Sequence, residues 1–288
     1  MTGNTETLRL TTQSRVHQIA SGILGGSATV RIQRTLLPGL RWNQEILGEI
    51  LEQNLDSETR WLDAGCGHHL LGAGLESVEC RLKRKAGLIV GVDIEVPKQA
   101  NDDELLRACA DLNHLPFVDE AVELISCNMV VEHLKNPEIA FREFARVLAP
   151  GGRLVIHTPN TLSYIVSTAR IAKTVLPRRW ILKLIHWSES REPEDVFPTF
   201  YRANTMGRLK SLLREAGLTE TCCRYLLGPQ AIFWRFAPIA LFELLLQRAS
   251  LWEPLQFLRA TLLVVYEKPG VRLPRPASDR VIAELKKV

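Results

Sequence analysis

Two short apolar segments, each leading into a turn, constrain the fold of this chain more than any other feature. The first ends at Leu62 and is followed by Asp63-Ala64-Gly65-Cys66-Gly67, and the second, Leu88-Ile89-Val90-Gly91-Val92, ends at Asp93. Glycines let a backbone bend sharply and approach a ligand where a β-carbon would clash. The spacing of the two segments fits one strand, a crossover helix and the next parallel strand. A carboxylate at the tip of the second strand suits a ribose diol.

The rest of the chain continues this alternation of helical and strand patterns. Turn residues Pro150-Gly151-Gly152 are expected to lead into the strand at 153–157. Apolar spacing predicts helices over 42–55, 70–85, 137–147 and 206–216. Strands are expected over 122–128, 153–157, 218–226 and 260–267. Such alternation predicts an α/β fold with a doubly wound, mainly parallel sheet.

Several motifs in order and at matching spacing resemble the class I S-adenosylmethionine-dependent methyltransferases, in the small-molecule branch called methyltransferase type 11. Besides the two segments above, they are Asp111-Leu112-Asn113-His114-Leu115-Pro116-Phe117, the strand at 122–128, Val131-Glu132-His133-Leu134 and the stretch 146–156. The resemblance is close over residues 58–160. It implies a Rossmann-like, seven-stranded sheet with an antiparallel last strand at the edge, and a helical cap or insertion.

The same resemblance implies the cofactor S-adenosyl-L-methionine and its binding residues. Asp63 would organise the turn and the cofactor's amino group, and the backbone of Ala64, Gly65, Cys66 and Gly67 would pass beside the methionine portion. Asp93, followed by Ile94, would hold both ribose hydroxyls. Asp111 would accept a hydrogen bond from the adenine amino group, with Leu112 packing nearby, and Asn128 would line the methionine end.

One departure from the family pattern concerns the start of the first crossover helix. The family usually has glycine at the position of His69, and here His68-His69 occupy it. A side chain at this point could reshape the site, cap the helix or weaken cofactor binding. The sequence leaves these three alternatives open.

Two histidines are candidates for a general base that removes a proton from the acceptor. His133 follows the fourth strand at the sheet edge where ligands bind, and His157 ends the fifth strand. A structural role is the alternative for each. Tyr201 and Arg202, in a segment dense in charges and aromatic rings, are candidate substrate contacts.

The expected function is methyl transfer to a small or lipid-linked acceptor, at oxygen as is most frequent in this branch. The alternative is a catalytically inactive relative that binds the cofactor or a partner protein, and only the enzyme would yield the demethylated cofactor. A nicotinamide-dependent dehydrogenase is disfavoured, because residues 65–70 lack the third glycine of that fingerprint.

The predicted organisation has five segments around one catalytic domain. They are an N-terminal arm or lid at 1–40, the cofactor-binding core at 41–160, a cap at 161–204, the completion of the sheet with an apolar helical insertion at 205–268, and a tail at 269–288. The cap contains a basic, aromatic segment at 171–187 that could lie on an anionic membrane surface or form a cap helix with its cations in water.

Composition narrows the partners and the compartment. A formal charge of +4 is too small and too dispersed to indicate nucleic-acid binding. The six cysteines lack metal-ligand spacing, so no metal site is expected, and they fit a reduced cytoplasm. The N-terminus lacks the pattern of a secretory signal, and the apolar stretch 231–246 is interrupted by charges and a proline. We expect a cytoplasmic protein, with peripheral membrane contact as an open alternative.

Overall fold

The computed structural model describes residues 35, 37, 40–41, 43–67, 70–71, 75–95, 105–167, 198–227 and 237–271 of the 288-residue chain. The chain divides into two compact units, each made of three sequence segments. Unit 1 comprises 1–42, 162–191 and 227–260, and unit 2 comprises 43–161, 192–226 and 261–288. The sheet and the candidate site residues described below belong to unit 2. The five-segment division stays a prediction.

The described residues of unit 2 form a seven-stranded sheet with the order β3-β2-β1-β4-β5-β7-β6. The first five strands in this order are parallel to one another, whereas β7 is antiparallel to both β5 and β6. The predicted Rossmann-like α/β fold and its antiparallel last strand are therefore confirmed. The strands are β1 (Arg60–Ala64), β2 (Leu88–Asp93), β3 (Leu106–Cys109), β4 (Val122–Asn128), β5 (Leu148–Pro159), β6 (Thr219–Leu226) and β7 (Thr261–Glu267).

The expected edge position of the last strand was wrong. β7 lies between β5 and β6, and β6 forms the edge of the sheet. The reason is that β7 forms antiparallel ladders with both β5 and β6, so each of its sides is paired.

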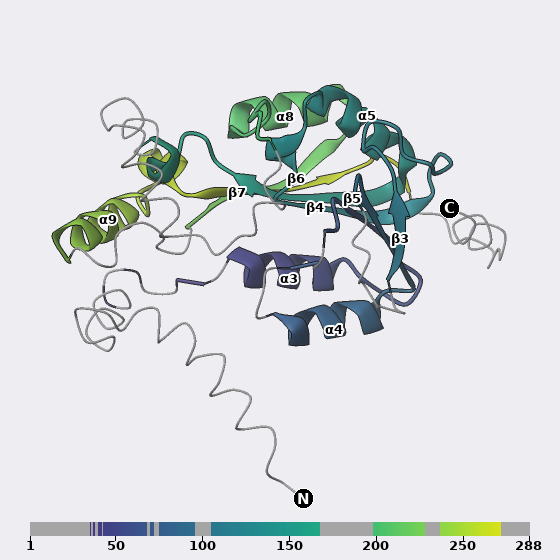
Figure 1. Ribbon diagram of the computed structural model, residues 1–288, viewed down its shortest axis with the longest axis horizontal. Helices are drawn as coiled ribbons and strands as arrows, with labels where there is room; N and C mark the ends of the chain where they lie inside the picture. The colour runs from purple at the N-terminus through teal and green to yellow at the C-terminus, as the bar shows by residue number, and fades with distance from the viewer. Residues whose placement is uncertain are drawn as a thin grey trace, which may run out of the picture. The chain divides into compact units, whose positions relative to one another are not determined.

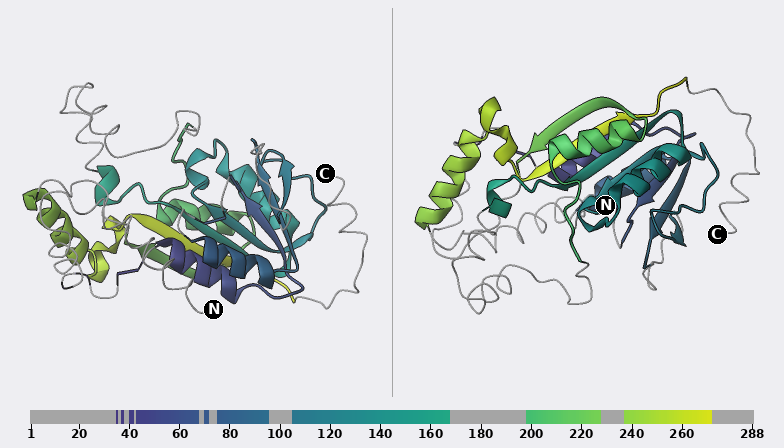
Figure 2. Two further views of the ribbon diagram at one scale, coloured as in Figure 1. Left: turned by 60° about the horizontal axis from the view of Figure 1, so that its bottom comes forward. Right: turned by 90° about the horizontal axis from the view of Figure 1, so that it is seen from above.

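Helices cover both faces of the sheet (Figure 1). Two of them, α3 (Asn43–Gln53) and α4 (Glu76–Lys85), lie on one face, while α5 (Pro137–Val147) and α8 (Met206–Glu215) lie on the other, as the two views of Figure 2 show. Strand side chains alternate between two apolar cores. Trp61 and Leu124 join the core under α3 and α4, and Leu62 and Ile125 join the core under α5 and α8.

Local sequence explains where these helices begin and end. Pro137 occupies the first turn of α5, where a missing N–H costs nothing. Thr205 caps α8 by accepting a hydrogen bond from Arg208 N, and Gly217 follows the helix with φ +84°. Of the helix expected over 70–85, the structure describes α4 from Glu76, and residues 72–74 lie outside the described residues.

The turn expected at Pro150-Gly151-Gly152 was wrong, because these residues are part of β5. Gly151 has φ +73°, and the pairing of β4 with β5 shifts register between Val122 and Leu124. The strand is continued by backbone hydrogen bonds from Gly151 N to Lys268 O and from Lys268 N to Gly152 O, both 2.9 Å. A glycine with positive φ here produces a bulge, not a chain reversal.

Unit 1 contains α9 (Ala237–Ala249) and the 3-10 helix η3 (Glu253–Leu258) among its described residues. No helix in the described ranges is both long and apolar enough to span a bilayer. All six cysteines of the chain are free thiols, including the adjacent Cys222 and Cys223.

Candidate active site at the carboxyl ends of the strands

The site lies where the strand order reverses between β1 and β4, the usual ligand position in a doubly wound sheet. The loop after β1 is held by hydrogen bonds from Gly65 N and Cys66 N to Val92 O, at 2.7 and 3.2 Å. Gly65 has φ +77°, and a β-carbon there would overlap the side chain of Val130. Gly67 has φ +41°, and a β-carbon there would meet nothing within 4 Å. The loop is thus packed tightly at Gly65 and open at Gly67.

Asp93 lies at the carboxyl end of β2 and is half-buried. Its Oδ2 accepts a hydrogen bond from Gly67 N at 3.0 Å, and its Oδ1 accepts one from Glu95 N at 3.3 Å. Each carboxylate oxygen has two lone pairs, so both oxygens retain capacity to accept from a ligand. Ile94, the next residue, is 63% exposed.

Arg107 on β3 braces the glycine loop, which the sequence analysis did not predict. Its Nη1 donates to Gly67 O at 2.5 Å and lies 3.7 Å from Cys66 Sγ. Its Nε is buried and has no hydrogen-bond partner in the described part of the chain. The contact crosses β2 at Gly91, which pairs with Arg107 and where a β-carbon would lie 2.7 Å from Cys66 Sγ. Burial raises the pKa of the Cys66 thiol to about 12, so the thiol stays protonated.

Asp63 is buried inside β1, not exposed in a loop. Ser126 Oγ donates to Asp63 Oδ1 at 2.5 Å and accepts from Trp61 Nε1 at 2.7 Å. Desolvation raises the pKa of Asp63 from 3.8 to about 7, although the Ser126 hydroxyl acts in the opposite direction. A carboxyl group with this pKa exchanges a proton near neutral pH.

The wild-type protein is expected to lose stability as pH rises from about 4 to about 7, and Asp63→Asn is expected to lack this loss. The folded protein binds more protons than the unfolded chain in this window, so its free energy of unfolding decreases as pH rises. The total change from this one group is at most about 4 kcal/mol. Urea unfolding of both proteins across the window measures it, with the exposed Asp111→Asn as control. Parallel pH profiles for the wild type and Asp63→Asn would contradict the burial argument.

Asp111 follows β3 in an exposed turn. Its Oδ1 accepts from Asn113 N at 2.9 Å and from Asn113 Nδ2 at 2.8 Å, so part of its acceptor capacity shapes the turn. Within the described residues, Oδ2 of Asp111 has no hydrogen-bond partner. Leu112 is buried in the core under α5 and α8.

Asn128 and His157 belong to a polar network that joins distant parts of unit 2. Asn128 Oδ1 accepts from His157 Nδ1 at 2.9 Å and from Gln44 Nε2 at 3.1 Å, while Asn128 Nδ2 donates to Leu70 O at 3.3 Å. His157 Nε2 accepts from Thr261 Oγ1 at 3.1 Å. Both ring nitrogens of His157 are engaged, and burial lowers its pKa to about 4. His157 is therefore a neutral imidazole at physiological pH.

His133 lies in a 3-10 turn, η1 (Val131–His133), directly after the carboxyl end of β4. Its Nδ1 lies 3.0 Å from Pro198 O. The same turn binds the chain near Pro198 a second time, because Phe200 N and Tyr201 N donate to Glu132 O at 2.7 and 3.1 Å. Residues 198–202 are thus bound to η1, and we name them the strap. The structure brings Tyr201 of the strap close in the fold to His133 of η1.

The strap carries both predicted substrate residues on its exposed side. Tyr201 is 39% exposed and has φ +51°, an uncommon conformation for a side-chain-bearing residue. The guanidinium carbon of Arg202 lies 6.0 Å from the centre of the Phe200 ring. Beneath the strap, Glu132 accepts from Thr158 Oγ1 at 3.0 Å, and Thr158 accepts from Asn204 Nδ2 at 2.6 Å.

Three residues that shape the site were not predicted from the sequence: Arg107, Ser126 and Gln44. Arg107 and Ser126 could have been recognised, since each is a polar residue inside an apolar strand. Gln44 is unremarkable in an amphipathic helix, and only the fold brings it to Asn128. His68 and His69 lie outside the described residues.

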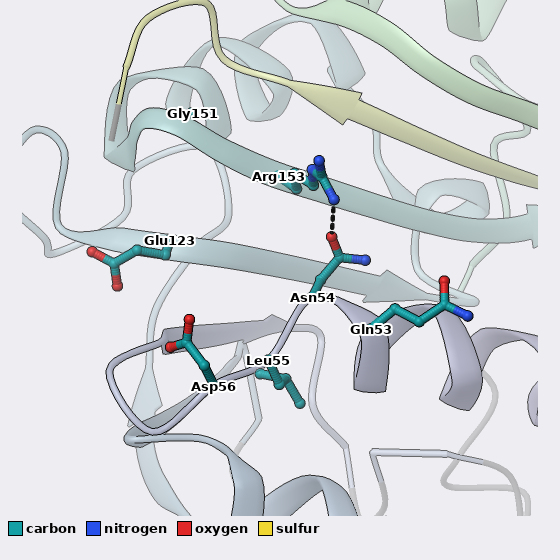
Figure 3. Close-up of a pocket in the computed structure, with 7 residues that line it drawn as sticks. All are labelled: Gln53, Asn54, Leu55, Asp56, Glu123, Gly151 and Arg153. Atoms are coloured by element: carbon teal, nitrogen blue, oxygen red, sulfur yellow. Dashed lines mark hydrogen bonds between the residues drawn. The ribbon is translucent and has the colours of Figure 1, made fainter. Parts of the chain in front are cut away.

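A small pocket of about 240 Å³ lies near the amino-terminal ends of β1, β4 and β5, away from the carboxyl ends that form the site (Figure 3). Its lining comes from the segment before β1 and from the amino-terminal parts of β4 and β5. Arg153 Nη1 donates to Asn54 Oδ1 there at 2.6 Å, so its cation is already bound. Ligands of doubly wound sheets bind at the carboxyl ends of strands, so this pocket is not the site described above.

Comparison with known proteins shows the family to which the chain is similar. A family model described as a methyltransferase domain matches residues 40–222. A malonyl-[acyl-carrier protein] O-methyltransferase of Hamiltonella defensa is 30% identical over 118 residues, which are 40% of this chain and 44% of that relative. A ubiquinone biosynthesis O-methyltransferase of Coxiella burnetii is 28% identical over 107 residues, covering 34% of this chain and 43% of that relative. The alignments thus span less than half of either relative's length.

Among solved structures, a putative methyltransferase in complex with the Haloferax volcanii Trm112 methyltransferase activator has the same fold. The TM-score is 0.51 at 17% identity, with 81% of this chain and 91% of that chain covered. The family match extends over more than half of the sequence and includes the glycine loop, Asp93 and the strap. The chain therefore belongs to the methyltransferase-domain family.

Proposed function

We propose that the chain methylates an oxygen atom of a small or lipid-linked acceptor. The observation that carries this proposal is that the glycine loop after β1 and the turn η1 after β4 follow neighbouring strands, with Gly65 packed against Val130. The turn η1 holds His133, and the strap bound to it holds Tyr201. The two O-methyltransferase relatives support oxygen as the methylated atom. One of them is named for a malonyl group on acyl-carrier protein and the other for ubiquinone biosynthesis.

The polar groups at the carboxyl ends of the strands fit S-adenosylmethionine. Asp93 offers acceptor lone pairs to a ribose diol, and the open side of Gly67 leaves space where a β-carbon would otherwise project. Asp111 Oδ2 is suited to an exocyclic amino group. When bound, S-adenosylmethionine supplies a methyl group activated by a sulfonium. Asp93, Arg107 and Asp63 then hold and shape its surroundings.

His133 is the better candidate for a general base. Pro198 O can only accept a hydrogen bond, so the proton must sit on Nδ1 of His133. That tautomer leaves the lone pair on Nε2, the nitrogen that would take a proton from an acceptor hydroxyl. Tyr201 and Arg202, on the same strap, would contact the acceptor.

His157 is proposed to act as a positioning residue. Its donated hydrogen bond fixes Asn128, which in turn holds the amino-terminal end of α3 through Gln44 and the chain at Leu70. Since both ring nitrogens are engaged and the ring is buried, proton transfer with an acceptor would require breaking this network.

Comparing His133→Ala with His157→Gln tests these two roles. His133→Ala is expected to lower kcat by about a hundredfold or more, with unchanged affinity for the cofactor, because it removes only a base. His157→Gln is expected to lower thermal stability and to change kcat less. Formation of the demethylated cofactor, with hydrophobic phenols and polyprenyl-linked phenols as acceptors, is the activity readout.

A wild-type rate retained in His133→Ala would exclude His133 as the base. A folded protein that binds the cofactor but gives no demethylated product above background with any acceptor would favour the inactive, partner-binding alternative.

A further inference from the structure

Helix α9 of unit 1 carries polar side chains on its buried side. Glu243 and Gln247 are 5% and 0% exposed, and both bind the hydroxyl of Tyr164, which donates to Glu243 Oε1 at 3.0 Å and accepts from Gln247 Nε2 at 2.7 Å. Ser250, just beyond the helix, is also buried and donates to Gln247 O at 2.7 Å. Burying a carboxylate or an amide costs free energy unless it is hydrogen-bonded, and here both groups bond the hydroxyl of Tyr164.

The exposed side of α9 carries large apolar residues next to Arg248, whereas a surface helix usually exposes polar residues. Phe242 and Leu245, three residues apart on one helical face, are 59% and 51% exposed. Trp252, which follows the helix, is 66% exposed. We name these three residues the α9 face. Large apolar residues exposed close together, as Phe242 and Leu245 are on one helical face, mark a surface that contacts another apolar phase.

Unit 1 also has a charge that differs sharply from that of unit 2. Its segments contain 14 Lys and Arg against 4 Asp and Glu, a formal charge of +10. Unit 2 contains 22 against 28, a formal charge of −6, so the modest +4 of the whole chain conceals two opposite units. Most cations of unit 1 lie outside the described residues, so the charge belongs to the unit's sequence and not to a mapped patch.

We propose that unit 1 docks on an anionic lipid bilayer, with the α9 face inserted into the headgroup region. A cationic unit is drawn to the negative surface potential of such a bilayer, and each nearby Lys or Arg adds to the attraction. Phenylalanine, leucine and an exposed tryptophan are the side chains that enter the boundary between headgroups and acyl chains. The proposal does not depend on the identity of the methyl acceptor or on cofactor binding.

The α9 face distinguishes a bilayer from other anionic partners. Nucleic acid and acidic proteins attract a +10 unit equally well, but neither needs an outward Phe242, Leu245 and Trp252 above a buried polar layer. A bilayer uses both features at once, the charge for attraction and the apolar face for insertion.

Co-sedimentation of the full chain with vesicles tests the proposal. We expect binding to vesicles of phosphatidylcholine with phosphatidylglycerol, weak binding to phosphatidylcholine alone, and a severalfold loss as salt is raised. Phe242→Ser and Trp252→Ser should each weaken binding about tenfold, because each removes apolar area from the boundary region. Val118→Ser is the matched control, since Val118 is 55% exposed but belongs to unit 2. It should bind as the wild type does.

Far-ultraviolet circular dichroism and cofactor titration on each variant separate lost docking from lost folding and from failure of the methyltransferase site. Absence of binding to the anionic vesicles would overturn the proposal. Binding by both serine variants that is as strong as that of the wild type would overturn it too. A dimer in solution that dissociates in Phe242→Ser would assign the α9 face to a second copy of the chain. Binding to RNA or to an acidic carrier protein that is lost in these variants, with none to vesicles, would assign the face to that partner.

Discussion

Asp93→Ala is expected to lower the affinity for S-adenosylmethionine about a hundredfold, or about 3 kcal/mol, while the protein stays folded. The substitution removes a charged acceptor that is placed at the carboxyl end of β2 for two ribose hydroxyls. It also releases the hydrogen bond from Gly67 N, which fixes the glycine loop in the absence of ligand. Calorimetric titration with S-adenosylmethionine and with its demethylated product measures the loss.

Glu95→Ala is the matched control, because Glu95 is an exposed carboxylate two residues further along the chain. Its affinity for the cofactor should equal that of the wild type. Asp93→Asn, which retains one acceptor oxygen but loses the charge, should fall between the two. An unchanged affinity in Asp93→Ala would remove this residue from the site.

Gly65→Ala is expected to destabilise the protein by about 3 kcal/mol, from backbone strain and overpacking together. The backbone at Gly65 has φ +77°, and the new β-carbon would overlap Val130 Cγ2 and lie 2.9 Å from Cγ1. Val130 Cβ would also lie only 3.1 Å away, so a change of the valine rotamer alone does not relieve the crowding fully. The midpoint of urea unfolding measures the effect.

Gly67→Ala provides the contrast. Its φ is also positive, but a β-carbon meets no described atom within 4 Å, so the expected loss of stability is only about 1 kcal/mol. The same open space is where the cofactor is proposed to lie, so Gly67→Ala should weaken binding more than stability. Equal destabilisation by the two substitutions would contradict the tight packing at Gly65.

The sheet could be predicted because its signals are local. Apolar runs with glycine turns located β1 and β2, and the resemblance over 58–160 supplied the order of the remaining core strands. Boundaries failed where one glycine changed the local geometry, as at Gly151, whose positive φ makes a bulge and not the expected turn.

The polar network around His157 could not be predicted, because its members are far apart in the sequence. His157 and Thr261 are 104 positions apart, and Asn128 and Gln44 are 84 positions apart. The contact of His157 with Thr261 depends on β7 lying next to β5, whereas the resemblance implied a last strand at the edge of the sheet. From the sequence, a histidine at a strand end is a candidate for catalysis with a structural role as the alternative, and its burial is visible only in the folded chain.

The charge of the two units shows a different limit. Net charge taken over the whole chain gave no indication of nucleic-acid binding, and it is small because the opposite charges of the units largely cancel. The units are made of interleaved segments, so no contiguous window of sequence reveals the +10 of unit 1. Only the division of the folded chain exposes it.

The most direct test of the account is a crystal structure of the protein with S-adenosylhomocysteine. We predict that the ribose hydroxyls lie within hydrogen-bonding distance of the Asp93 carboxylate, beside the backbone of Gly65 to Gly67. The adenine amino group should lie near Asp111. A nucleoside bound elsewhere, for example in the polar pocket beside Arg153, or no bound nucleoside at saturating concentration, would contradict the assignment of the site.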